Sequence, residues 1–395
     1  MGGGAAGFFL AINLKEMCPM MEVTIVEAAS RVLRKVEISG GGRCNLTNTF
    51  EGASADLQGV YPRGHRLLKR LFNVFGPRDA FRWFEQRGVA LTVQPDHCVF
   101  PRSQDSHSII NLFLAEVRRL GITVQTGTRV TSLTDVSDYD FVCVTTGGQP
   151  RGEGLAWLEQ PFEQPVPSLF TFAIADEGLH RLMGTVAERA TALIPGTRLR
   201  ADGPLLVTHW GMSGPCILKL SSLGARWLSE AAYQAPLAVN WTGSTEGEAF
   251  EALAAIAVRN PHRQVASVPP LNLSQRLWAY LVEKSLGPSR MNTPWNGLSQ
   301  KELRRLTNTL TNDSYRIAAR APFKDEFVTC GGVSLKAVQT QTLQSRTHPR
   351  LFFAGEVLDI DGITGGFNFQ AAWTTAYVVA TALRKKASIN ALQPV

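Results

Sequence analysis

The sequence predicts an α/β fold in which a Rossmann-like dinucleotide-binding domain is interrupted by a second domain, part β and part helical. Three observations lead to this prediction. A glycine-rich motif with an acidic partner stands at the N-terminus. An apolar strand and a second glycine-rich turn precede a long apolar helix near the C-terminus. Between them, short runs typical of strands give way to a long stretch with helical periodicity.

The N-terminal motif has the spacing GxGxxG, formed by Gly2, Gly4 and Gly7, and opens an apolar stretch. Gly2 permits a tight turn, Gly4 lets backbone N–H groups approach a pyrophosphate, and Gly7 allows close helix–strand packing. Glu27, twenty residues after Gly7, ends the strand expected over residues 23–27 and is placed to bind ribose hydroxyls. A glycine-rich loop beside a buried helix is the alternative; the acid at this distance favours dinucleotide binding.

A Rossmann unit also needs a strand directly before its glycines, at the centre of its parallel sheet. The sequence begins at Met1, so we expect that strand to be absent, as it would be with a late initiation codon or a truncated chain. The parallel sheet that should hold the glycine motif is then expected to be incomplete.

The elements that follow can be assigned from periodicity and from turn residues. Residues 38–48 are too rich in glycine for core and too polar for a helix, so we expect a functional loop. The remaining expected elements of the first domain are a helix over 67–88, a hairpin over 89–100, a helix over 106–120, and strands over 122–125 and 141–145. The last strand runs into Gly147 and Gly148, typical either of a turn beneath a dinucleotide or of a generic buried strand.

The composition shift beyond this strand marks the inserted domain. Short β-like runs occur between residues 165 and 242, leucines recur at helical spacing over 247–311, and 327–333 returns to the first domain. The expected boundaries are 1–164 and 334–395 for the first domain, 165–246 and 312–333 for the β-rich domain, and 247–311 for its helical insertion.

The C-terminal block combines an apolar strand, acids and a helix start. Residues 351–362 end in glycine and acidic residues, and Gly365 and Gly366 open an apolar helix. An acid there can meet ribityl or phosphate hydroxyls, and free N–H groups at a helix N-terminus can stabilise electron density on a flavin ring. A buried strand–loop–helix is the alternative, and co-occurrence with the N-terminal motif favours the flavin.

Composition restricts the class of protein. The 395 residues are 44% hydrophobic and carry a net charge of +7, which indicates a globular protein and slightly favours a polyanionic partner. Six cysteines without a CxxC pair argue against a zinc site and a secreted disulfide framework, and seven histidines show no metal-ligand spacing. We therefore expect no metal and a soluble protein of the reducing cytoplasm, with residues 367–383 as a buried helix and not a membrane span.

Five segments, taken together and in order, resemble the BaiN/RdsA family of NAD(P)/FAD-dependent oxidoreductases. They are SGGGRCNLTN at 39–48, TTGG at 145–148, LLVTHWGMSGPCILKLSS at 205–222, TCGGV at 329–333 and AGEVLDIDGITGGFNFQAAW at 354–373. The resemblance implies an FAD domain of the two-dinucleotide type built from both chain ends, interrupted by a β-barrel-like domain with a helical insertion. It also implies a reductase that passes hydride from a nicotinamide to an unsaturated acceptor: bile-acid intermediates, or uracil in 23S ribosomal RNA to give dihydrouridine.

Carried over residue by residue, the resemblance assigns FAD binding to a set of positions from both chain ends. They are Gly2, Gly4, Ala5, Ala6, Gly7, Glu27, Gly42, Arg43, Cys44, Asn45, Gly147, Gly355, Glu356, Asp361, Gly366, Asn368 and Gln370. The chain departs from the family over 149–164, where a longer loop is shortened to QPRGEG at the expected pocket mouth. No second GxGxxG with a following acid is present, so either NAD(P)H docks transiently on the flavin or a partner reductase supplies electrons.

Three functions are compatible with these features. The first is reduction of a uracil C=C bond in ribosomal RNA, favoured by the resemblance and by basic runs on both sides of the glycine loop. These are Arg31, Arg34, Lys35 and Arg43, then Arg63, His65, Arg66, Lys69 and Arg70, and a solvated helix face would explain them equally well. The second is reduction of a small hydrophobic enone, and the third is a non-catalytic flavin-bound RNA-interaction protein. The oligomeric state is left open.

Two side chains are candidates for catalysis. Cys44 follows Arg43, so a lowered thiol pKa and proton donation opposite the hydride are one hypothesis, and a small packing residue is the other. His209, with Thr208 and Ser213 as expected hydroxyl neighbours, is placed to polarise a substrate carbonyl. A histidine that caps a turn is the alternative there.

Overall fold

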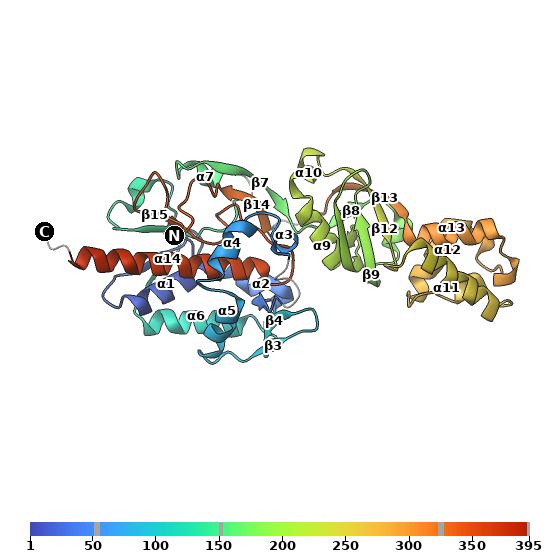
Figure 1. Ribbon diagram of the computed structural model, residues 1–395, viewed down its shortest axis with the longest axis horizontal. Helices are drawn as coiled ribbons and strands as arrows, with labels where there is room; N and C mark the ends of the chain where they lie inside the picture. Colours follow the sequence, from blue (N-terminus) through green and yellow to red (C-terminus); the bar gives the residue numbers. More distant parts are fainter. Residues whose placement is uncertain (51–55, 150–152, 323–327, 393–395) are drawn as a thin grey trace. The chain divides into compact units, whose positions relative to one another are not determined.

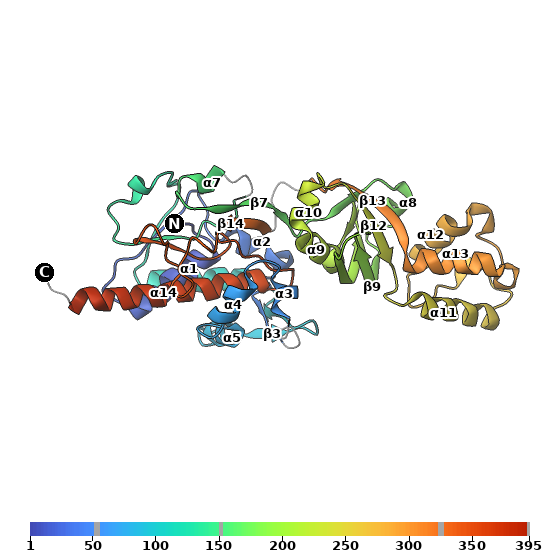
Figure 2. The same ribbon diagram turned by 45° about the horizontal axis from the view of Figure 1, so that its top comes forward.

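The computed structural model describes residues 1–50, 56–149, 153–322 and 328–392, and the chain divides into two compact units (Figures 1 and 2). Unit 1 comprises Met1–Val166 and Val328–Val395, and unit 2 comprises Pro167–Phe327. The predicted fold class is confirmed: a Rossmann-type unit drawn from both chain ends is interrupted by a unit with a closed β-barrel. Phe327 and residues 150–152 of the shortened loop lie outside the described residues.

Unit 1 contains two pairs of parallel strands and a small antiparallel sheet. β1 (Thr24–Val26) pairs with β5 (Thr123–Gln125), and β6 (Val142–Val144) pairs with β15 (Leu351–Phe353). The antiparallel sheet has the order β2 (Thr47–Asn48), β4 (Cys98–Pro101), β3 (Leu91–Val93), and β7 (Phe162–Ser168) pairs with β14 (Val328–Val333). The strands expected over 122–125 and 141–145 and the hairpin over 89–100 are thus present.

The first two residues lie between the two parallel pairs. The Gly2 N–H donates to Val26 O of β1 (2.7 Å), whereas the Met1 amino group donates to Cys143 O of β6 (2.7 Å) and Met1 O accepts from Thr145 N (2.8 Å). Met1 and Gly2 therefore occupy the central position that the first strand of a Rossmann unit takes, next to β1 on one side and β6 on the other. This places the glycine motif at the carboxyl ends of β1, β6 and β15.

Helices of unit 1 pack an aromatic core against this sheet. The helices and the 3-10 turn η1 are α1 (Ala5–Met17), α2 (Arg34–Gly42), α3 (Leu57–Val60), α4 (His65–Leu71), α5 (Pro77–Glu85), α6 (His107–Arg119), η1 (Leu133–Val136), α7 (Glu153–Ala156) and α14 (Phe367–Leu392). α14 runs alongside α1 (Figure 1), where the rings of Phe9 and Trp373 have centroids 5.1 Å apart. Trp373 is fully buried and its indole N–H donates to Leu46 O (2.9 Å). The core thus joins the two ends of the chain.

Two local expectations need correction. The single helix expected over 67–88 is two helices, α4 and α5, because Gly76 and Pro77 interrupt it: Pro77 stands at the first position of α5, where its missing N–H costs nothing. Residues 34–38 are helical, so the loop expected from residue 38 begins at Ser39, whose ψ of 147° ends the helix.

Unit 2 is built on a closed antiparallel barrel with the strand order β10-β11-β8-β13-β12-β9. The strands are β8 (Phe172–Ile174), β9 (Val186–Leu193), β10 (Arg200–Val207), β11 (Gly211–Ser213), β12 (Ala235–Asn240) and β13 (Asp313–Arg320). α8 (Glu177–His180), α9 (Gly214–Leu223) and α10 (Ala225–Glu230) connect them. Buried Phe172, Val207, Leu237 and Ile317 belong to one core cluster.

A helical insertion separates β12 from β13. It consists of α11 (Glu246–Arg259), η2 (Val265–Ser267), α12 (Gln275–Leu286), η3 (Pro288–Arg290), η4 (Trp295–Gly297) and α13 (Gln300–Thr311) (Figure 2). Its core contains Trp278 and Trp295, whose rings stack with centroids 6.2 Å apart. In the described parts of the chain, no helix has the length and apolar character that crossing a membrane requires.

Candidate cofactor site

The N-terminus of α1 has the shape of a phosphate cradle. A Cβ on Gly7 would fall 2.1 Å from Gly2 O and one on Gly2 would fall 2.4 Å from Thr145 O, so both positions require glycine for packing. At Gly4, by contrast, a Cβ would meet no atom within 4 Å. Gly4 caps α1 without a side-chain hydrogen bond, and the first turn carries no acidic residue. The first-turn N–H groups therefore point into open space that suits an anion.

Glu27 lies beside this cradle at the end of β1. Its carboxylate accepts the N–H groups of Gly3 (2.7 Å) and Ala29 (2.7 Å), and the side chain is partly exposed. These two bonds hold the carboxylate against the glycine loop and leave it further acceptor positions. The carboxylate can therefore accept further hydrogen bonds from hydroxyl donors beside the glycine loop.

The loop 39–48 and the start of α14 form one structure although they are far apart in sequence. Asn48 Nδ2 donates to Gly365 O (3.1 Å), and the Asn45 amide donates to Thr47 O (3.1 Å) and accepts from Gly366 N (3.2 Å). A Cβ on Gly366 would fall 2.3 Å from Thr47 O, which explains the glycine. The contact sets the direction of α14, whose first N–H groups have no partner inside the helix.

Neighbouring side chains fix the same turn. Both the N–H and the C=O of Gly362 are bound by the Asn368 side chain (2.8 and 2.9 Å), and Tyr61 donates its hydroxyl to Phe367 O (2.7 Å). The backbone of Gly355 approaches α1 so closely that a Cβ would lie 2.8 Å from the Cβ of Ala6. The C-terminal block is thereby packed directly on the N-terminal motif.

Glu356 is the centre of a second polar cluster at this edge. Its Oε2 pairs with Lys35 Nζ (2.9 Å) and its Oε1 accepts from Thr329 N (2.9 Å). A Cβ on Gly148 would fall 2.4 Å from Thr329 Oγ1, so the turn after β6 also meets the cluster. The Thr329 hydroxyl is buried and has no hydrogen-bond partner among the described residues. Such an orphan group indicates a missing ligand or water.

Three of the residues assigned to FAD binding have no exposed surface, and two of them are engaged by other side chains. Asp361 forms an ion pair with Arg63, and Gln370 accepts from Thr47 Oγ1 (2.6 Å). Cys44 has no exposed surface either. In this structure these side chains support the loops that line the site, because a group with no exposed surface cannot touch a ligand without rearrangement.

Of the two hypotheses for Cys44, the structure goes against a lowered thiol pKa and agrees with a packing residue. Burial raises the pKa of the Cys44 thiol to about 12, against a smaller lowering by a hydrogen bond with Ser39. The Arg43 guanidinium does not serve the thiol: it stacks 4.4 Å above the centroid of the Phe100 ring and donates to Gly40 O (3.1 Å). Cys44 itself has a positive φ of 60°, which indicates a residue held by its loop.

His209 lies in unit 2, in the turn between β10 and β11, with an exposed side chain. Its ring contacts Trp210, with centroids 4.8 Å apart. The two hydroxyls expected beside His209 bond to other groups. Ser213 Oγ bonds to Thr171 Oγ1 (2.7 Å), and Thr208 Oγ1 accepts from Trp210 N (3.3 Å). The structure thus provides no support for a hydroxyl–imidazole pair.

Some residues of the basic runs form ion pairs, and others lie exposed outside these pairs. Arg31 pairs with Glu37 (2.9 Å), as Lys35 pairs with Glu356 and Arg63 with Asp361. Arg31 and Lys35 are exposed as well, and the exposed basic side chains outside these ion pairs are Arg34, Arg66, Lys69 and Arg70, three of them on α4. Arg63, Lys35 and Thr329 are site residues that sequence reasoning did not assign, although TCGGV at 329–333 was a signal for the last.

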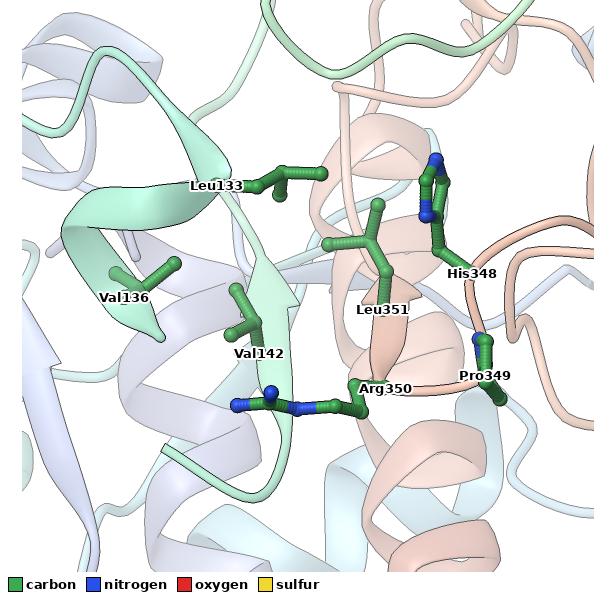
Figure 3. Close-up of a pocket in the computed structure, with 7 residues that line it drawn as sticks. All are labelled: Leu133, Val136, Val142, His348, Pro349, Arg350 and Leu351. Carbon is green, nitrogen blue, oxygen red and sulfur yellow. The ribbon is translucent and has the colours of Figure 1, made fainter. Parts of the chain in front are cut away.

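A pocket of about 200 Å³ lies at the opposite edge of the sheet (Figure 3). It is lined by Leu133, Val136, Val142, His348, Pro349, Arg350 and Leu351. Val142 and Leu351 begin β6 and β15, whereas ligands of open α/β sheets bind beyond the carboxyl ends of strands. Among the described residues, no group of three or more potential metal ligands is found.

The geometry fits a dinucleotide: an uncapped helix start for the pyrophosphate, an acid for a ribose, and a second helix start supplied by the other chain end. Fold and site together define the class, a flavoenzyme-type oxidoreductase with a Rossmann domain. The chain belongs to the HI0933-like protein Rossmann domain family, whose model matches residues 1–157 and 161–382.

Curated relatives match over almost the whole length. A 3-dehydro-bile acid delta(4,6)-reductase of Clostridium scindens is 26% identical, over 98% of both chains. Ribosomal RNA dihydrouridine synthases of Escherichia coli and Haemophilus influenzae are each 25% identical, over 96% and 98% of both chains. Among solved structures, a 3-ketosteroid delta1-dehydrogenase of Sterolibacterium denitrificans shares the fold, with a TM-score of 0.51 and 9% identity over 98% of both chains.

Proposed function

We propose that the protein is an FAD-dependent reductase that uses NAD(P)H to reduce a C=C bond, with a uracil base of 23S ribosomal RNA as substrate and dihydrouridine as product. The observation that carries the cofactor assignment is the cradle at α1, where an uncapped helix start, the open space at Gly4 and the carboxylate of Glu27 lie together. FMN lacks the pyrophosphate and adenosine that these groups address, which favours FAD.

Each part of the site has a defined task in this proposal. The first-turn N–H groups of α1 bind the pyrophosphate, and Glu27 accepts hydrogen bonds from the adenosine ribose. The Glu356 carboxylate can accept from ribityl hydroxyls in place of Lys35 or the Thr329 N–H, and the Thr329 hydroxyl, which has no partner among the described residues, can donate to a ribityl or phosphate oxygen. The start of α14 directs N–H groups at developing negative charge. Bound FAD supplies the hydride chemistry, while the chain orients the substrate and excludes water.

The choice of substrate rests on relatives and on charge. Two of the three relatives above carry the name ribosomal RNA dihydrouridine synthase. The net charge of +7 and the exposed Arg66, Lys69 and Arg70 of α4 suit a polyanion. Reaction in the reducing cytoplasm, where ribosomal RNA resides, agrees with a chain whose cysteine spacing indicates no disulfide framework.

A second candidate is reduction of a small hydrophobic enone. It is favoured by the bile-acid reductase, which is related at the same level of identity as the RNA enzymes. A flavin-bound RNA-interaction protein without turnover is a third candidate. The electron donor is part of the proposal: NAD(P)H that docks transiently on the flavin, or a partner reductase.

The deciding experiment is nucleoside mass spectrometry of ribosomal RNA from cells with and without the gene. Loss of one dihydrouridine on deletion, restored by the wild-type gene, supports the RNA reaction. Unchanged dihydrouridine, combined with enone-dependent oxidation of the reduced flavin in purified protein, favours the second candidate. RNA binding without oxidation of the flavin by any acceptor identifies the third.

A further inference from the structure

The turn between β10 and β11, residues 208–210, lies at a defined end of the unit-2 barrel. Trp210 O accepts from Ile174 N (2.9 Å) at the end of β8, and Val207 N donates to Thr185 O (2.9 Å) just before β9. The helical insertion leaves the barrel at the same end, after Asn240, which pairs with Thr191 of β9. We call residues 208–210 the hairpin tip.

The hairpin tip presents aromatic and apolar side chains to solvent. Trp210 is 39% exposed, and its ring meets the exposed His209 ring with an interplanar angle of 47°. Met183 is 57% exposed in the adjacent segment, where Gly184 N donates to Val207 O (2.9 Å). Val186, which pairs with Leu206, is 39% exposed. Trp241, Trp278, Trp295 and Trp373 are fully buried, whereas Trp210 and Trp227 are exposed to a similar extent. What distinguishes Trp210 is that other exposed apolar side chains lie on the adjoining segments, which makes a patch.

Exposed arginines lie on the elements that adjoin the hairpin tip. Arg276 of α12 donates from Nη2 to Arg181 O (2.5 Å), which brings two exposed arginines together in the segment that leads from α8 to Met183. Arg189 of β9 is also exposed. The exposed acids of the same elements are Glu177, Glu188 and Glu283, and α12 also carries the exposed Lys284, so four exposed basic side chains stand against three exposed acids. Exposed aromatic faces beside arginines match single-stranded nucleic acid, whose bases stack and whose phosphates are anionic.

We propose that the hairpin tip is an RNA-contact surface on which Trp210 stacks an unpaired base while Arg181 and Arg276 contact the flanking phosphates. This inference rests on the proposed function in one respect: ribosomal RNA is taken as the occupant. It adds a binding surface in unit 2, outside the cofactor site of unit 1. Stacking on one indole selects unpaired segments over duplex, because bases in a duplex present no free face.

The test measures binding by fluorescence anisotropy of a labelled single-stranded 23S segment and of a duplex of equal length. We expect Trp210→Ala to weaken binding of the single strand roughly tenfold and to change duplex binding little. Trp227→Ala is the matched control, since Trp227 is 38% exposed in the same unit but lies on α10. Trp210→Phe is expected to keep most of the affinity, and Arg276→Ala to lower the slope of log affinity against log salt by about one.

Equal RNA binding by wild type, Trp210→Ala and Trp227→Ala overturns the inference. It is also overturned if Trp210→Ala binds RNA as wild type does but no longer binds a protein partner. If Trp210→Ala does not fold, judged by circular dichroism, Trp210→Phe and Arg276→Ala carry the test, and wild-type affinity and salt slope in both overturn it. The proposed function fails separately. Wild-type protein that binds RNA through Trp210 but forms no dihydrouridine refutes the reaction and leaves the surface, whereas dihydrouridine formation with Trp210-independent binding does the reverse.

Discussion

The two edges of the unit-1 sheet show how a binding site differs from a hollow. At the amino ends of β6 and β15 a pocket is present, but Arg350 there already donates to Asp140 O (3.2 Å) and Ser137 O (2.7 Å). At the carboxyl edge, the α1 start is uncapped and the Thr329 hydroxyl is buried without a partner among the described residues. Unmatched hydrogen-bonding groups, more than concave shape, therefore indicate where a ligand belongs.

The largest effect is expected from breaking the buried ion pair at the carboxyl edge. Arg63→Met removes the guanidinium that forms an ion pair with the carboxylate of Asp361, a side chain with no exposed surface. We expect a loss of about 3–5 kcal/mol in the free energy of unfolding, measured by urea denaturation. Adding Asp361→Leu should recover much of this loss, because the buried charge is then removed as well. An Arg63→Met variant as stable as wild type would show that the Arg63–Asp361 pair does not stabilise the fold.

The glycine motif separates packing from binding. Gly7→Ala places a Cβ 2.1 Å from Gly2 O, so we expect about 1–3 kcal/mol lower stability together with loss of FAD. A Cβ at Gly4 meets no atom of the described chain within 4 Å, so Gly4→Ala should fold almost normally while binding FAD more weakly. Thermal unfolding and the amount of FAD recovered after reconstitution separate the two. Equal behaviour of both variants would contradict the cradle.

The two edges can be compared directly by one substitution at each. Glu27→Gln at the carboxyl edge weakens the acceptors for the ribose hydroxyls, and we expect the FAD dissociation constant to rise about tenfold, which is about 1.4 kcal/mol. His348→Ala in the amino-edge pocket should leave it unchanged. Titration of the apoprotein with FAD measures both constants. A larger FAD dissociation constant for the His348→Ala variant would place the cofactor at the amino edge and contradict the site assigned at the carboxyl edge.

The smallest effect concerns the thiol at the carboxyl edge. The Cys44 pKa is about 12 in the folded chain and about 9 in the unfolded chain. The contribution of the protonated thiol to the free energy of unfolding is therefore fully present below pH 9. As pH rises from 9 towards 12, the unfolded thiol ionises first and this contribution falls, by at most about 1.4 kcal/mol for each pH unit. Urea denaturation of wild type and Cys44→Ala between pH 7.5 and 9.5 should show a difference that narrows by about 1 kcal/mol or less as the pH rises. A constant difference, or rapid alkylation of Cys44 in the folded state at pH 8, would argue for an activated thiol.

Sequence reasoning succeeded where a residue type has one local reason. The helix over 106–120 and the hairpin over 89–100 follow from periodicity, and both are present as α6 and as β3 with β4. The glycine motif with Glu27 predicted a helix start with an acid at the end of the next strand, and both lie at one edge. Reasoning from periodicity failed at Gly76, because apolar spacing continues across a break that backbone geometry imposes.

The sequence alone showed which motifs are present. They are a dinucleotide motif with its acid, a glycine-rich loop at 39–48, and a C-terminal turn that opens an apolar helix. The tertiary structure alone decided which of these groups remain available to a ligand. Asp361 and Gln370 are engaged by Arg63 and Thr47, and the Cys44 thiol has its pKa raised by burial although it follows an arginine. The physical reason is that burial and hydrogen bonding depend on residues hundreds of positions away, and no local pattern records them.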